Sequence, residues 1–177
     1  MLKSLNIKGR KTVLRLFNHC FSAGSYPWNT SVIIPLLKSG NAHDPDNYRP
    51  IAISSCLGKL FSTILFDRLV NFRNEFCPDP PNQLGFCKNS QTNDHTFALK
   101  TIIDKYNTRG KKRVFSCFVD FKKAFDTVCR SALLYKLVQL QIRGPFFEVL
   151  ENMYNSSHAK IKINNKLSDA FDILSGT

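Results

Sequence analysis

The chain has 177 residues, of which 43% are hydrophobic and 15 are Phe, so it is not a disordered tail. Lys and Arg number 25 against 13 Asp and Glu, and the net charge of +12 favours a polyanionic partner, either nucleic acid or an acidic membrane face. The 6 Cys form no C-x-x-C pair and the 4 His complete no zinc spacing. We therefore expect no structural zinc, reduced thiols, and an intracellular location, nuclear or cytoplasmic, without secretion. No apolar run approaches the length of a membrane span, so no membrane association is expected.

The N-terminal part predicts a helix followed by a hairpin. Residues 8–22 have helical spacing of apolar side chains and a basic outer face, which predicts an N-terminal helical extension over 1–25. Short strands are predicted over 31–38 and 48–54, plausibly paired, with a polar loop between them. Pro35 predicts an edge position or a bulge at that point of the first strand.

Two helices are predicted in the middle of the chain. The first carries its apolar residues on one face from Leu57 to Phe72 and ends before Pro78. The second has Ser90 or Thr92 as its cap. Its apolar face is expected to consist of Leu99, Ile102, Ile103 and Tyr106.

A strand is predicted over 114–119, and it delivers Asp120 at its end. Further helices are predicted around 133–138 and from Pro145 onward, where proline suits the first turn. The alternation at 160–163, a turn at Asn164-Asn165 and a return strand over 167–173 predict a closing hairpin.

The segment from Val114 to Asp126 has two readings of equal weight when taken alone. A buried strand ending in Asp120 could hold a divalent cation beside a phosphate, because carboxylate oxygens are hard ligands. It could equally be a core strand with a solvated Asp at its exit.

Four motifs stand in a fixed order along the chain: Ile34-Pro35-Leu36-Leu37-Lys38, Asn47-Tyr48-Arg49-Pro50-Ile51, Gln83-Leu84-Gly85-Phe86, and Phe118-Val119-Asp120-Phe121-Lys122-Lys123-Ala124-Phe125-Asp126. Together they resemble the fingers and the first palm motif of a reverse transcriptase, of the type encoded by non-LTR (LINE-like, jockey-like) retrotransposons. The resemblance covers residue 26 to the end. It implies an α+β fold that is a partial right-hand polymerase, with fingers helices and a small antiparallel sheet over 26–113 and an incomplete palm over 114–177.

The resemblance also implies roles for individual residues. Asp120 matches the first catalytic, metal-binding Asp, and the backbone at Phe121 would meet metal and triphosphate. Lys38 and Arg49 match fingers residues that reach the β- and γ-phosphates, and their point charge and planar fork suit phosphate oxygens. Phe125 matches the residue under the incoming sugar, where a ring favours dNTP over rNTP. The resemblance also implies that Gln83, Gly85 and Phe86 lie near the template. It implies that Asp126 orients local structure and is not a metal ligand.

The chain also departs from the family. The Gln-Gly…Ser-Pro and Ala-Asp-Asp motifs that follow in family members are not found, so the chain reads as truncated before the second catalytic Asp motif. The intact parent would be an RNA-directed DNA polymerase using Mg²⁺ (or Mn²⁺), dNTPs, an RNA template and a DNA primer. Whether this chain is itself an enzyme is left open, and we expect it to be inactive alone, because one carboxylate cannot hold two metals. The alternatives are a non-enzymatic basic nucleic-acid-binding remnant of a decayed element and, third, a globular domain unrelated to polymerases.

Overall fold

The computed structural model describes residues 4–78, 80, 82–87, 89–108 and 113–176. The chain divides into two units, one formed by residues 1–67 and 123–177 and the other by residues 68–122, and each is described by itself. Among the described residues there are five α-helices and five short strands, which confirms the α+β class. The right-hand polymerase arrangement, with its subdomain boundaries after residues 25 and 113, stays a prediction.

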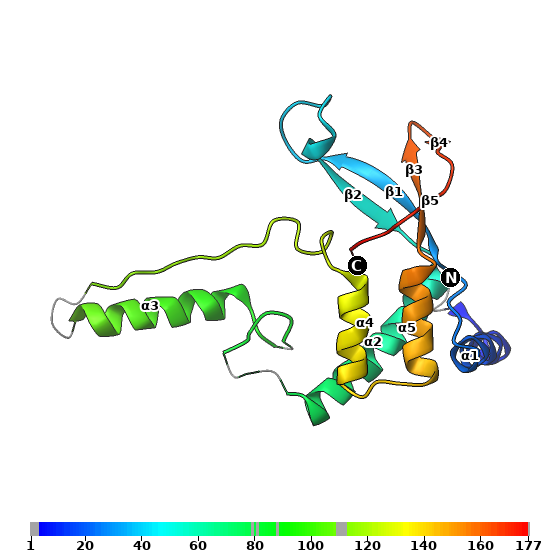
Figure 1. Ribbon diagram of the computed structural model, residues 1–177, viewed down its shortest axis with the longest axis horizontal. Coiled ribbons are helices and arrows are strands. Elements are labelled where there is room, and N and C mark those ends of the chain that lie inside the picture. Colours follow the sequence, from blue (N-terminus) through cyan, green and yellow to red (C-terminus); the bar gives the residue numbers. More distant parts are fainter. Residues whose placement is uncertain (1–3, 79, 81, 88, 109–112, 177) are drawn as a thin grey trace. The chain divides into compact units, whose positions relative to one another are not determined.

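The first unit contains a sheet in the order β2-β1-β3-β4, with β5 also pairing with β3 (Figure 1). β1 (Thr30–Leu37) and β2 (Tyr48–Ile53) form the predicted antiparallel hairpin, and a short 3₁₀ turn, Pro45–Asn47, lies in its connecting loop. β3 (His158–Ile163) runs parallel to β1. The expected antiparallel sheet is therefore mixed. A parallel pairing is possible here because a long, helix-containing stretch of chain connects the two strands.

Pro35 occupies the kind of position that the sequence predicted. Thr30 to Ile33 of β1 pair with β3, so beyond Ile33 the strand pairs only with β2. Pro35 stands opposite Pro50 in the hairpin register. Since neither proline can donate a backbone hydrogen bond, this must be a non-hydrogen-bonded pair, and the ladder loses nothing there.

The closing hairpin has the predicted turn but a broken return strand. Asn164 (φ 47°) and Asn165 (φ 63°) both have the left-handed conformation that a two-residue hairpin turn requires. The return strand consists of β4 (Lys166–Leu167) and β5 (Phe171–Asp172), which pair with β3 in registers that differ by one residue. The extra residue is a bulge. It arises where the Ser168 hydroxyl, and not a backbone carbonyl, accepts a hydrogen bond from the Ile161 N–H at 2.9 Å.

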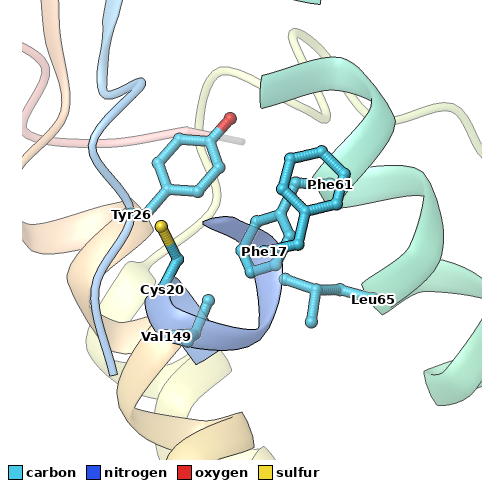
Figure 2. Close-up of a cluster of buried hydrophobic side chains, with 6 residues drawn as sticks. All are labelled: Phe17, Cys20, Tyr26, Phe61, Leu65 and Val149. Atoms are coloured by element: carbon cyan, nitrogen blue, oxygen red, sulfur yellow. The ribbon is translucent and has the colours of Figure 1, made fainter. Parts of the chain in front are cut away.

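Three helices enclose the core of the first unit. α1 (Ile7–Ser22) begins as predicted and is capped by the Asn6 side chain, which accepts from the Gly9 N–H at 2.8 Å. α2 (Cys56–Phe76) and α5 (Pro145–Asn155) also match the predicted helices. They bring together a buried cluster (Figure 2), whose members are Phe17, Cys20, Tyr26, Phe61, Leu65 and Val149. The Phe17 and Phe61 rings lie 5.1 Å apart, so aromatic packing dominates this core.

The second unit contains α3 (Thr92–Thr108), and none of its residues from 92 to 107 is buried. The predicted face of Leu99, Ile102, Ile103 and Tyr106 is thus not covered within the described chain: Ile102 is 49% and Tyr106 48% exposed. The predicted cap at Ser90 or Thr92 is wrong. The Asp94 carboxylate instead reaches back and accepts from the Gln91 N–H at 2.7 Å.

The predicted strand over 114–119 is wrong as well. Residues 113–121 have no regular secondary structure, and residues 122–127 form turns before α4 (Arg130–Gln139). Phe115 is 88%, Phe118 81% and Val119 80% exposed. None of the described strands pairs with this segment, so its backbone has no hydrogen-bonded neighbour that could stabilise a strand.

Candidate nucleotide and template site

The β1–β2 hairpin places two proposed phosphate-binding cations on one face. Leu36 pairs with Arg49, and the Lys38 N–H donates to the Asn47 carbonyl at 2.8 Å, which continues the same register past the end of β1. Because side chains alternate along a strand, Lys38 shares the face of Leu36 and hence of Arg49. Both cations are exposed. The structure therefore brings Lys38 and Arg49 together at the loop end of the hairpin.

Apart from Asn47, the rest of this hairpin face is apolar, and it carries no carboxylate. Its remaining hairpin positions are Val32, Ile34, Leu36, Asn47, Ile51 and Ile53. Leu36 is 57%, Ile51 45% and Ile53 51% exposed. A planar apolar group and a polyanion could therefore bind side by side here, the first on the aliphatic side chains and the second on the two cations.

Phe125 and Asp126 lie in the turn that precedes α4. Lys123 adopts a left-handed conformation (φ 51°), and its carbonyl accepts from the N–H groups of Asp126 at 3.0 Å and Thr127 at 3.1 Å. The Lys123 ammonium lies 3.2 Å from a carboxylate oxygen of Asp46. Both side chains are exposed, so the pair contributes little stability. It does show that this turn meets the connecting loop of the hairpin that carries Lys38 and Arg49.

Asp120 and Phe121 belong to the second unit, and both are exposed. Among the residues that the structure describes, no group of three or more His, Cys, Asp or Glu side chains could hold a metal ion. Two-metal polymerisation needs several carboxylates around two ions about 3.5–4 Å apart. Asp120 alone does not fit that requirement.

The predicted template-binding residues form one small turn in the second unit. The Gln83 amide donates to the Gly85 carbonyl at 3.1 Å, and the Cys87 N–H donates to the Leu84 carbonyl at 3.3 Å. Phe86, not Gly85, has the left-handed backbone (φ 64°), and its side chain is 87% exposed. This conformation is uncommon for a bulky residue and places an aromatic ring on the surface.

Sequence reasoning missed Arg130, which lines two neighbouring cavities of the first unit. One has a volume of about 560 Å³, lies against the sheet face of Ile33 and Ala52, and includes Trp28 and Asp126 in its wall. The other has about 600 Å³ and includes Cys129 and Asp172. Nothing in the sequence pattern around Arg130 indicated this position, because the groups it contacts come from distant segments.

Burial affects one titratable group beside Arg130. It raises the pKa of the Tyr154 hydroxyl above the ordinary tyrosine value, while the positive charge of Arg130 opposes the rise. The Cζ atom of Arg130 lies 5.6 Å from the Tyr154 ring centroid, so guanidinium and ring also attract each other as a cation–π pair.

Comparison with known proteins identifies the family. The family model described as reverse transcriptase (RNA-dependent DNA polymerase) matches residues 36–174. The chain is 26% identical over 171 residues, 94% of its length, to a probable RNA-directed DNA polymerase from transposon BS of Drosophila melanogaster. It is 29% identical over 133 residues, 71% of its length, to the RNA-directed DNA polymerase from mobile element jockey of the same species.

The chain therefore belongs to the reverse transcriptase family, and its relatives are polymerases of non-LTR retrotransposons. This confirms the resemblance drawn from the four motifs. Family membership does not favour the alternative of a non-enzymatic nucleic-acid-binding remnant. It overturns the alternative of a globular domain unrelated to polymerases. The chain spans only 18% and 14% of the lengths of the two relatives. Among the described residues, no helix is long and apolar enough to cross a membrane.

Proposed function

We propose that this chain forms the nucleotide-binding part of an RNA-directed DNA polymerase, comprising the fingers and the start of the palm. Lys38 and Arg49 bind the β- and γ-phosphates of an incoming dNTP, and Phe125 lies beneath its sugar. The observation that carries the proposal is the hairpin register, in which Leu36 pairs with Arg49 and Lys38 follows on the same face. The ion pair between Lys123 and Asp46 joins the Phe125 turn to the loop of that hairpin. The neighbouring Asp126 lines a cavity against the opposite hairpin face, that of Ile33 and Ala52, so the turn meets the hairpin at its loop and not on the face of Lys38 and Arg49.

The remaining roles follow from the family. Asp120, with the backbone of Phe121, supplies one of several ligands for Mg²⁺ (or Mn²⁺), and the other carboxylates come from outside these residues. Gln83, Gly85 and Phe86 contact the RNA template, which pairs with a DNA primer, and Asp126 orients the turn. Family membership supports these assignments and an intracellular location.

The test is equilibrium dialysis of the 177-residue chain against labelled Mg·dATP, with variants Lys38→Ala and Arg49→Ala. Each removes a charge-assisted contact to phosphate and is expected to weaken binding roughly tenfold. Lys8→Ala is the matched control, because Lys8 is an exposed cation on α1 and its loss lowers the net charge equally. Equal effects of Lys8→Ala and Lys38→Ala would show that the hairpin attracts nucleotides only through net charge, and the proposal would then fail.

A further inference from the structure

Arg130 joins three segments of the first unit that are far apart in sequence. It is the first residue of α4, and its Nη1 donates to the carbonyls of Tyr154 and Ile173. Its Nε donates to the Gly176 carbonyl at 3.0 Å. One guanidinium thus satisfies a carbonyl in the last turn of α5, one just after β5 and one near the end of the chain. A planar fork of donors can do this, whereas an ammonium cannot match the same directions.

Gly176 lies directly against the backbone of the Phe125 turn. Its N–H donates to the Val128 carbonyl at 3.1 Å, and its φ is +84°. A Cβ atom at this position would lie 3.0 Å from the Phe125 carbonyl oxygen and 3.1 Å from the Asp126 Cα. These are backbone atoms that cannot turn aside as a side chain can. A side chain at residue 176 would therefore displace these backbone atoms by a few tenths of an ångström, and the positive φ would add strain.

We propose that Arg130 and Gly176 are positioning residues that set the place of Phe125 and thereby the discrimination between deoxyribose and ribose. This inference rests on the proposed function, since it concerns the same sugar contact. Arg130 holds the Gly176 carbonyl, Gly176 packs under Phe125 and Asp126, and the Val128 hydrogen bond fixes the end of the turn. On its other side the turn has the exposed Lys123–Asp46 pair, which is weak. The Arg130–Gly176 contact is therefore a stronger constraint on the turn than this ion pair.

The first experiment compares the affinities of the chain for Mg·dATP and Mg·ATP in Gly176→Ala, Arg130→Lys and Phe125→Ala. Gly144→Ala is the control for the glycine, because Gly144 also has a positive φ (+65°) but no atom lies within 4 Å of a Cβ added there. Arg143→Lys is the control for the exchange of Arg for Lys, because Arg143 is exposed. We expect Gly176→Ala and Arg130→Lys to bring the dATP-to-ATP affinity ratio to that of Phe125→Ala, while both controls keep the wild-type ratio. A general loss of structure lowers both affinities together and leaves the ratio unchanged.

The second experiment needs no nucleotide. Amide hydrogen exchange is measured at Asp126 and Thr127, whose N–H groups both bond to the Lys123 carbonyl. Gly176→Ala and Arg130→Lys are expected to accelerate exchange there on the order of tenfold through local opening, and the two control variants leave it unchanged.

The outcomes separate the two proposals. If Phe125→Ala leaves the dATP-to-ATP ratio unchanged, or the wild-type chain binds neither nucleotide, the proposed function fails, and the exchange data alone decide whether the contact positions the turn. If Phe125→Ala changes the ratio but Gly176→Ala and Arg130→Lys do not, the positioning role is wrong and the proposed function stands. Unchanged exchange at Asp126 and Thr127 in both variants also overturns the positioning role.

Discussion

Phe61 is the residue whose loss tests the described core most sharply. It is 2% exposed, and its ring centroid lies 5.1 Å from that of Phe17, 5.6 Å from that of Trp28 and 6.3 Å from that of Tyr26. A buried aromatic side chain covers about 150–250 Å². At about 25 cal/mol per Å² this burial stabilises the fold by at most roughly 4–6 kcal/mol. Substitutions of this kind cost about 3–5 kcal/mol, so Phe61→Ala should lower the free energy of unfolding by about that amount.

The assay is urea unfolding followed by far-ultraviolet circular dichroism. Trp28 fluorescence serves as a second probe, since the chain has 1 Trp and it packs on Phe61. Phe66→Ala is the control, because Phe66 lies on the same helix and is 62% exposed. Its cost should stay within about 0.5 kcal/mol. Because small proteins are stable by only about 5–15 kcal/mol, Phe61→Ala removes a large share of the total. Equal shifts for the two variants would refute the assignment of Phe61 to the centre of the core.

Three further predictions concern the turn, pH and catalysis. Asn165→Val should destabilise the closing hairpin by about 1–2 kcal/mol in urea unfolding and Asn165→Gly should not, because residue 165 has a φ of 63°; equal effects would argue against the left-handed turn. Burial raises the pKa of Tyr26, so above pH 10.0 the unfolded state loses its tyrosine proton first and the free energy of unfolding should fall as pH rises. Tyr26→Phe should make this fall smaller than in the wild type. An unchanged pH profile would contradict the burial of the Tyr26 hydroxyl. The isolated chain should not extend a DNA primer on an RNA template with Mg²⁺, because the described residues hold no carboxylate cluster; robust dNTP incorporation would overturn this.

The helices were predictable because they depend on local periodicity. α1, α2 and α5 begin within a residue or so of the positions that their apolar spacing and Pro145 indicated. The β1–β2 hairpin was also predictable, since two short strands lie on either side of a polar loop. The parallel pairing of β1 with β3 was not, because nothing in either strand encodes a neighbour more than a hundred residues away.

The candidate site was predictable by motif more than by conformation. Lys38 and Arg49 were named from the sequence, and the register places them on one face. The segment 114–119 has the composition of a strand, but composition does not provide the neighbour that a strand requires. The role of Arg130 was not predicted, because its three hydrogen-bond acceptors are backbone carbonyls. Every residue has such a carbonyl, so the sequence does not indicate which ones Arg130 binds. The left-handed backbone at Phe86 was missed because the adjacent Gly85 is the residue that normally takes it.

The central claim is that Lys38 and Arg49 act together on one triphosphate. A double-mutant cycle of Lys38→Ala and Arg49→Ala, with dissociation constants for Mg·dATP and for Mg·dADP, measures this directly. We expect the two effects on dATP binding to be non-additive, and both to become smaller for dADP, which lacks the γ-phosphate. Additive effects of the same size for both nucleotides would contradict it.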